Sequence, residues 1–293
     1  MSSETAPGSV REYRGRSERI TAPGLFRTGA VYLLLLCGAL LTVAPLVLSA
    51  LTAIKTPGQF ANESALALPD PPTWENFSTV LQHGLGRAVL VTALMTVFIT
   101  GGQLFTSILA AYAFARTEFP GREALFWVYL GTMMVPSMVT LIPLYLMFAK
   151  LHWLNTFWAL ILPFVLASPY AIFLLRQYFR GIPEELLGAA RLDGANTLDI
   201  LVHVMVPMSR PILATLALIT IVSQWNNFMW PLVASSGDTW RVLTVSTASL
   251  QTRYNAQWTL VMAATTLAIV PLVLLFVVFQ RQVLRSIAWT GLK

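Results

Sequence analysis

The chain has 293 residues, of which 56% are hydrophobic and 11% are charged. Soluble domains carry about 25% charged residues, so this composition excludes an ordinary soluble protein and predicts a membrane protein. The net charge is +6. Because the basic residues are not interleaved with aromatic residues, as a nucleic-acid surface requires, we expect no nucleic-acid partner.

Six apolar runs without a charged residue follow one another along the chain. Each is longer than the roughly 20 residues that a helix needs to cross the hydrocarbon core of a bilayer. We therefore predict an all-α membrane protein with six transmembrane helices, over about 29–54, 88–115, 124–149, 153–175, 211–237 and 255–280. They belong to one domain, residues 29–285, between an N-terminal tail (1–28) and a C-terminal tail (286–293).

We expect prolines to interrupt three of these runs. A proline removes one helical hydrogen bond and clashes with the preceding turn, so neighbouring helices must satisfy the carbonyl groups that it frees. We expect kinks or breaks at Pro136, Pro143, Pro163, Pro169 and Pro271.

The basic residues set the orientation of the spans. With the N-terminus inside, 14 of the 19 Lys and Arg residues fall in segments that face the cytoplasm. This bias follows the positive-inside rule, so both termini are predicted to be cytoplasmic, together with the segment 182–210. The first apolar run is too long for a signal peptide.

The segment 182–210, which we call the elbow, is charged and lies between two apolar runs. Pro183 lacks only an N–H group that the first turn of a helix does not need. Glu184 and Glu185 suit the positive end of the helix dipole. We expect a short helix over about 183–192.

The elbow continues through a predicted turn into a second helix. Asp193 and Gly194 can form the turn, because glycine accepts the positive φ that other residues resist. Asn196 or Thr197 can cap the second helix, and Pro207 and Pro211 end it. Its apolar face is expected to consist of Leu198, Leu201, Val202 and Met205, at helical spacing.

The elbow has two interpretations. It could be an amphipathic loop that rests on lipid head groups. However, its sequence resembles the coupling loop of the permeases of binding-protein-dependent ABC importers, whose pattern is Glu-Ala-Ala, three residues, Gly, nine residues and Ile-x-Leu-Pro. Here the pattern falls on Gly188-Ala189-Ala190, Gly194 and Val204-Met205-Val206-Pro207.

This resemblance implies that the elbow contacts an ATPase subunit. One departure is notable, since Gly188 replaces the glutamate that in relatives can pair with a basic residue of the ATPase. Glu184 or Glu185 lies one turn earlier and is a candidate substitute. The implied contact residues are Glu184, Glu185, Gly188, Ala189, Ala190, Asp193, Gly194 and Pro207.

Three other stretches, 110–122, 134–145 and 224–232, resemble the carbohydrate-uptake branch of these permeases, which includes maltose and glycerol-3-phosphate types. The third carries amides within an apolar run, and a buried amide in a membrane needs a partner. Gln224, Trp225, Asn226 and Asn227 therefore either line the translocation path or its gate, or join helices by hydrogen bonds. The polar segment 235–258 is expected to be an external loop directed toward a docked binding protein.

Several functions lack their sequence signatures. No G-x-x-x-x-G-K-[ST] phosphate-binding loop occurs, so the chain is not an ordinary P-loop ATPase. No ionisable residue lies inside the six runs, which disfavours a proton- or sodium-coupled carrier. The three histidines are scattered and Cys37 is the lone cysteine, so neither a metal site nor a catalytic cluster is expected.

The resemblance implies a permease subunit, not an enzyme, in the inner membrane of a bacterium. It would form half of the path for a sugar or a glycerol-3-phosphate-like solute. The implied partners are a second, different permease, two ATPase subunits that hold ATP and Mg²⁺, an external substrate-binding protein and membrane lipid. An ion-coupled secondary transporter, or an ABC permease for peptides or another solute, is the alternative.

Overall fold

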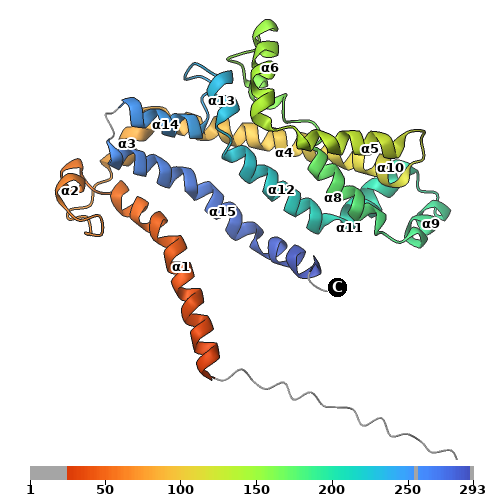
Figure 1. The fold of residues 1–293 in the computed structure, drawn as a ribbon, viewed down its shortest axis with the longest axis horizontal. Helices are drawn as coiled ribbons and strands as arrows, with labels where there is room; N and C mark the ends of the chain where they lie inside the picture. Colours follow the sequence, from red (N-terminus) through yellow and green to blue (C-terminus); the bar gives the residue numbers. More distant parts are fainter. Residues whose placement is uncertain (1–24, 254–256, 291–293) are drawn as a thin grey trace, which may run out of the picture. The chain divides into compact units, whose positions relative to one another are not determined.

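The computed structural model describes residues 25–253 and 257–290, and the helices there account for most of the chain (Figure 1). The longest helices are α1 (Leu25–Ala53), α4 (Leu85–Arg116), α12 (Arg210–Trp225) and α15 (Trp258–Thr290). The shorter ones are α2 (Pro57–Asn62), α3 (Glu75–Gln82), α5 (Arg122–Gly131), α6 (Ser137–Lys150), α7 (Phe157–Ile161), α8 (Pro169–Arg180), α9 (Glu184–Leu192), α10 (Thr197–Asp199), α11 (Val206–Met208), α13 (Met229–Ala234) and α14 (Leu243–Arg253). A 3₁₀ turn, η1 (Thr132–Met134), and a π-helix, η2 (Ile200–Met205), complete the set.

The chain divides into two units, residues 1–46 and 47–293. The predicted N-terminal tail lies, up to residue 24, outside the described residues. In the first unit, the side chains of α1 from 29 to 46 are exposed and mostly apolar, as contact with lipid requires. The contacts, cavities and proposed sites described below all lie in the second unit.

Three helices are long and apolar enough to cross a membrane, Thr28–Ala53, Leu85–Arg116 and Trp258–Gln280. They correspond to the first, second and sixth predicted spans. Two bent pairs of helices bring the candidates to five if each pair is one span, namely Arg122–Met134 with Ser137–Lys150 and Thr197–Met208 with Arg210–Trp225. The described chain is therefore an all-helical membrane protein with three to five candidate spans.

The predicted span 124–149 is broken. α5 and α6 meet at 97° across η1 and the Val135-Pro136 step. Proline disfavours the helical conformation of the residue before it, and Val135 is extended, with ψ at 117°. The break expected at Pro136 is confirmed, whereas Pro143 and Pro271 lie inside continuous helices.

The predicted span 153–175 is not one continuous helix, and the breaks expected at Pro163 and Pro169 are present. The chain forms α7, an irregular segment over 162–168 and then α8, with Pro163 in the irregular segment and Pro169 at the start of α8. Side chains of neighbouring helices satisfy two of the freed carbonyl groups. Gln103 Nε2 donates to Phe164 O at 3.5 Å, and Tyr129 Oη donates to Ala167 O at 2.5 Å.

A glycine of α4 admits this irregular segment. A Cβ atom on Gly102 would lie 2.3 Å from Val165 Cγ2 and 2.9 Å from Val165 O. Both distances are too short for non-bonded atoms, so only a glycine allows the two backbones to approach so closely. The adjacent Gly101 has open space around its missing Cβ.

The predicted fifth span and the loop after it also differ from expectation. α12 ends at Trp225, and α13 follows after three residues. Much of the expected external loop is the helix α14, whose Leu243 and Leu250 are buried. The Leu243 N–H donates to Thr92 Oγ1 of α4 at 2.8 Å. The expectation of a loop is therefore wrong for 243–253, because these residues bury an apolar face.

Two apolar clusters organise the unit. The elbow cluster joins the end of α4 to α8, α9, η2 and α12, and its fully buried members include Leu175, Phe179, Leu187, Met205 and Leu216. A second cluster lies where α4 meets α6, α7, α13 and the start of α14, and it includes Met95, Ile99, Phe148, Leu160 and Trp230. α4 contributes to both, so this one helix connects the two regions.

Candidate functional site

The elbow is a helix–turn–helix, and its first half ends as its sequence predicts. α9 runs to Leu192, and Gly194 has a φ of +86°. The Gly194 N–H donates to Arg191 O and the Ala195 N–H donates to Ala190 O, each at 3.0 Å. These two bonds form a Schellman motif, which satisfies the last carbonyl groups of α9 and requires the left-handed conformation at Gly194.

The second helix of the elbow begins with a capping box. Asn196 Oδ1 accepts the N–H groups of Leu198 and Asp199 at 2.9 and 3.0 Å, and Asp199 Oδ2 accepts the Asn196 N–H at 3.1 Å. Of the two caps proposed from the sequence, the structure therefore uses Asn196. Reciprocal bonds of this kind fix the start of a helix without help from distant residues.

The buried face of the second helix differs from the predicted one. Leu201 and Met205 are buried, but Leu198 is 63% exposed and Val202 is 48% exposed. The reason is that Ile200–Met205 is a π-helix, whose wider turn brings Ile200 into the core in place of Val202. The helix ends at Met208, between Pro207 and Pro211, where the chain bends by 78° into α12.

The elbow presents a mixed apolar and acidic surface. Leu192 is 91% exposed, and Ala189 and Asp193 are exposed beside it. Gly188 has open space around its missing Cβ. Glu185 is exposed and makes no hydrogen bond or ion pair within the described residues. Of the two candidates for the missing glutamate, Glu185 is the one whose carboxylate is not engaged by this chain.

Glu184, in contrast, is held from two sides. Its Oε2 accepts a hydrogen bond from Arg116 Nη1 at 2.6 Å, and its Oε1 is 3.2 Å from Arg191 Nη1. The Arg116 side chain is only 12% exposed, whereas that of Arg191 is 54% exposed. The first residue of α9 is thereby attached to the last residue of α4.

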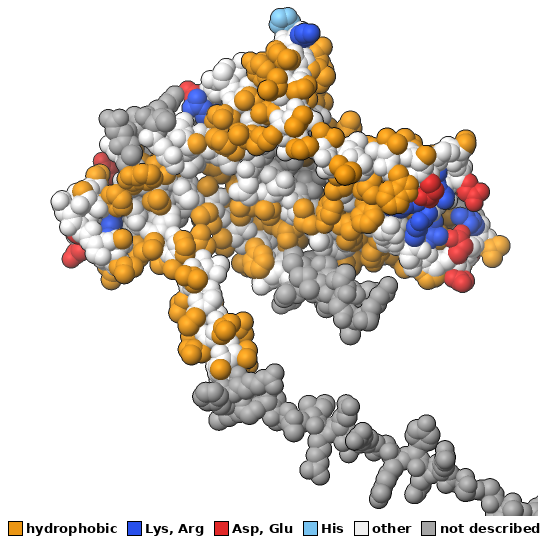
Figure 2. All heavy atoms as spheres, in the orientation of Figure 1, with side chains coloured by type: hydrophobic (Ala, Val, Ile, Leu, Met, Phe, Trp, Pro, Cys, Tyr) orange, Lys and Arg blue, Asp and Glu red, His pale blue; other side chains and the backbone are white. Residues whose placement is uncertain are grey.

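A second ionic group holds α5 to α8. The Arg176 side chain is 3% exposed and donates to Glu123 Oε1, which also lies 3.1 Å from Arg180 Nη2. Arg176 Nε donates to Phe114 O at 3.2 Å, and its guanidinium lies 3.9 Å from the centre of the Phe126 ring. Figure 2 shows the resulting concentration of acidic and basic side chains at the end of the molecule that carries α9 and α10.

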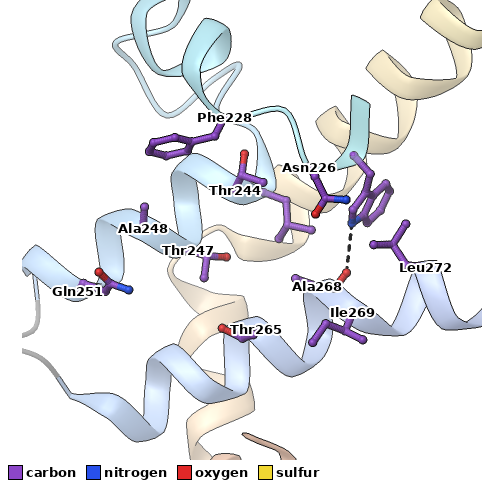
Figure 3. A pocket seen from close by; sticks show the side chains of 12 residues that line it. Asn226, Phe228, Thr244, Thr247, Ala248, Gln251, Thr265, Ala268, Ile269 and Leu272 are labelled. Carbon is purple, nitrogen blue, oxygen red and sulfur yellow. Dashed lines mark hydrogen bonds between the residues drawn. The ribbon is translucent and has the colours of Figure 1, made fainter. Parts of the chain in front are cut away.

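The proposed path residues lie where α12 ends and turns into α13. Gln224 and Trp225 are buried, whereas Asn226 is exposed. The Trp225 indole N–H donates to Ala268 O of α15 at 3.1 Å, the bond marked in Figure 3. Asn227 Nδ2 lies 3.3 Å from Gln224 Oε1, and Asn226 Nδ2 donates to Val222 O at 2.8 Å. Only Trp225 therefore bonds to another helix through its side chain.

Two cavities flank this turn. The α15 cavity is about 400 Å³ and lies between the turn, α14 and α15; Figure 3 shows Asn226, Thr247 and Gln251 among its lining side chains. The α6 cavity is about 530 Å³ and lies between α6, α12 and α13. Its polar lining residues are Ser137, Thr140, Ser223, Gln224, Asn226 and Asn227, and its aromatic lining residues are Phe164, Phe228 and Trp230. No residue that lines either cavity is charged.

Comparison with known proteins identifies the family. Residues 103–289 match the family described as "Binding-protein-dependent transport system inner membrane component". The chain belongs to this family. It is thus a multi-pass inner-membrane permease component of a binding-protein-dependent transport system, which decides against an ion-coupled carrier.

Two curated permeases illustrate the relationship. The arabinooligosaccharides transport system permease protein AraQ of Halalkalibacterium halodurans is 32% identical over 263 residues, which cover 87% of this chain and 92% of AraQ. The sn-glycerol-3-phosphate transport system permease protein UgpE of Yersinia pestis is 32% identical over 265 residues, which cover 87% of this chain and 94% of UgpE.

A solved structure shares the fold of the permease. It is a bacterial ABC transporter involved in the import of the acidic polysaccharide alginate, one chain of which superposes with a TM-score of 0.76 at 26% identity. The match covers 87% of this chain and 95% of that one. A second structure, of the alginate ABC transporter in complex with an alginate pentasaccharide-bound periplasmic protein, matches with a TM-score of 0.60 at 15% identity.

The sequence did not identify the residues that hold these regions in place. Nothing in the sequence distinguishes Arg116, Glu123 and Arg176 from the other charged residues, and only the fold brings them together. Gln103 offered a usable signal, because an amide inside an apolar run needs a partner. The structure supplies Thr220, whose hydroxyl donates to Gln103 Oε1 at 2.9 Å.

Proposed function

We propose that this permease forms one half of the translocation path of an ATP-driven importer and couples to an ATPase subunit through residues 182–207. In this proposal the chain crosses the membrane six times, with α5 and α6, α7 and α8, and α12 and α13 each counted as one span. Both termini and the elbow face the cytoplasm. The partners are a second, different permease, two ATPase subunits that bind ATP and Mg²⁺, and an external binding protein.

The observation that carries the coupling role is the construction of the elbow. Its turn and caps are satisfied locally by the Schellman motif and the Asn196 capping box. Its inner face belongs to the elbow cluster, together with the ends of α4, α8 and α12. A rigid element of this kind can transmit a displacement to the helices beneath it, while its outer face, with Leu192 and Glu185, is available to a partner.

The lining of the cavities supports an uncharged carbohydrate as the solute. Amides and hydroxyls can hydrogen-bond to the hydroxyl groups of a sugar, and aromatic rings can pack against its apolar faces. A phosphate ester in a site of low polarity needs a paired cation, and neither cavity is lined by one. Between the solutes named for AraQ and UgpE, the former type therefore fits this chain better.

The coupling role is tested by replacing Gly194 with valine. A β-branched residue is strained at a φ of +86° and would distort the Schellman motif. With the importer complete in proteoliposomes, we expect ATP hydrolysis to continue while uptake of the solute retained by the cognate binding protein falls. Gly131→Ala is the control, because Gly131 lies outside the elbow, has a φ of −58° and has open space around its missing Cβ. Normal uptake by Gly194→Val would contradict the coupling role.

The solute class is tested by direct uptake of radiolabelled solutes. Cells that express the complete importer would be given radiolabelled arabinotriose, sn-glycerol-3-phosphate or an alginate trisaccharide. We expect only the neutral trisaccharide to accumulate, and Asn226→Asp, which adds a negative charge beside both cavities, to reduce its uptake. Accumulation of either anionic solute would overturn the assignment of an uncharged carbohydrate.

A further inference from the structure

Arg116 joins the elbow to the long helix α4. It is the last residue of α4, and its guanidinium contacts three groups in the segment from α8 to α9. Nη1 donates to Glu184 Oε2 at 2.6 Å. Nη2 donates to the carbonyl oxygens of Phe179 and Ile182, at 2.6 and 2.5 Å. One side chain therefore binds the end of α8, the connection after it and the first residue of α9.

The chemistry of this contact suits a guanidinium group. Carbonyl groups at the end of a helix lack intrahelical donors and carry the negative end of the helix dipole, which a cation complements. A planar guanidinium with several N–H donors fixes the direction of its partners, which an ammonium group does not. The apolar packing of the elbow cluster has no such directionality, so Arg116 restricts sliding between α9 and α4 in a way that packing alone does not.

The opposite end of α4 is attached to the segment that leads into α14. Arg87 Nε donates to Thr239 O at 3.0 Å, and Thr92 Oγ1 accepts the Leu243 N–H at 2.8 Å. Leu243 lines the α15 cavity. At a rise of about 1.5 Å per residue, α4 extends for about 48 Å. The helix thus runs from the elbow to the wall of a cavity, and each end is held by directional hydrogen bonds.

We propose that Arg116 is a positioning residue that makes α4 the helix through which a displacement of the elbow reaches the cavities. This inference rests on the proposed coupling function of the elbow. It assigns to Glu184 an internal role as the partner of Arg116, and it leaves Glu185 as the acidic residue of the elbow that faces the ATPase subunit.

The test is a distance measurement that does not depend on the identity of the solute. Spin labels would be placed by Leu90→Cys on α4 and Leu274→Cys on α15, both exposed positions, with Cys37 replaced by serine. In the assembled importer, we expect ATP with vanadate to populate a second distance between the labels. Arg116→Gln should reduce that population about tenfold, which lies within the usual range of coupling between sites.

Arg191→Gln is the matched control. Arg191 contacts the same carboxylate as Arg116, but its side chain is 54% exposed, and we expect the nucleotide-driven population to remain unchanged. Arg116→Lys keeps the charge but not the planar guanidinium group, and it should give an intermediate population of the second distance. If Arg116→Gln fails to assemble with the ATPase subunits, Arg116→Lys and Glu184→Gln carry the test.

Two outcomes would overturn the proposal. The first is a distance distribution that ATP with vanadate does not change in the wild-type importer, because α4 would then not move. The second is a wild-type response in every Arg116 and Glu184 variant that assembles. Gly194→Val separates this failure from failure of the coupling role: if it abolishes the response while Arg116→Gln retains it, the elbow couples without Arg116. If both variants respond like the wild type, the elbow itself does not couple.

Discussion

The elbow end and the cavity end of the permease are held together by different chemistry. At the elbow, charged pairs such as Arg116 with Glu184 and Arg176 with Glu123 connect one helix to the next. Around the cavities, neutral groups join one helix to the next: the Trp230 indole N–H donates to Ala159 O at 2.9 Å, and the Thr220 hydroxyl donates to Gln103. The charged Arg87 also donates there, but its acceptor, Thr239 O, is a carbonyl group and not a carboxylate. The two regions share α4 and α12.

The difference follows from the cost of burying charge. The carboxylates of Glu184 and Glu123 remain at least half exposed, so only their arginine partners lose water. In an apolar interior both partners would lose it, and the attraction between them does not reliably compensate. Neutral hydrogen bonds avoid that cost while still fixing direction. Four substitutions would break or sharpen this comparison, and they are given from the largest expected effect to the smallest.

Trp230→Ala tests the cavity end. Trp230 is 3% exposed and packs edge-on against Phe148, with 5.4 Å between ring centres. Removing so large a buried side chain should lower the free energy of unfolding by about 3–5 kcal/mol, measured by thermal unfolding of the purified complex in detergent. Trp158→Ala is the control, because Trp158 is 60% exposed. Similar losses for both variants would show that the wall of the cavity is not tightly packed.

Arg176→Gln tests the elbow end. The substitution removes charge-assisted bonds to Glu123 and Phe114 O, and it should cost about 2–3 kcal/mol in the same unfolding assay. Arg180→Gln removes a cation that contacts the same carboxylate from a side chain that is 41% exposed. Its cost should stay below about 1 kcal/mol, as for other exposed pairs. Equal costs would mean that the burial of Arg176 does not increase its contribution to the free energy of unfolding.

Gly102→Ala and Gly101→Ala form a matched pair in α4. The added methyl group at 102 would collide with Val165, and overpacking of this kind costs about 1–3 kcal/mol. At 101 it meets nothing within 4 Å, so alanine should be neutral or slightly stabilising. The free energy of unfolding of the two variants, measured side by side, would test the close approach of the 162–168 segment. Equal stability would refute that approach.

Asn196→Ala should have the smallest effect. It removes the N-cap of α10 and should cost about 1 kcal/mol, whereas Asn196→Asp keeps an acceptor and should restore most of that loss. Hydrogen exchange of the amides of 198 and 199, which the cap holds, would report the change locally. Unchanged exchange in Asn196→Ala would show that the capping box does not stabilise the elbow.

Local features of the elbow could be predicted because their causes are local. Gly194 has the expected positive φ, Asn196 caps the second helix, and the first helix ends at Leu192. The apolar face of the second helix was predicted wrongly, because α-helical periodicity was assumed where the chain forms a π-helix. Whether a π-helix or an α-helix forms depends on packing in the elbow cluster, whose residues come from distant parts of the sequence.

The same distinction holds for the spans. The span predicted over 88–115 from its composition lies within α4, since a long apolar run can satisfy its backbone only as a helix. Breaks at Pro163 and Pro169 were expected, but the length of the irregular segment and its partners were not, because its carbonyl groups are satisfied by Gln103 and Tyr129, which come from other helices. Hydropathy records the apolar character of such a segment but not the distant donors that allow it to be irregular.

The sequence by itself determined that this is a membrane permease with a locally capped elbow, because composition, turn residues and family pattern are properties of adjacent residues. The tertiary structure alone decided which of the expected proline breaks occur, which carboxylate of the elbow is engaged, and that both cavities are lined without charge. Those features depend on side chains that are far apart in the sequence, as Arg116 and Glu184 are, and they exist only once the helices have packed.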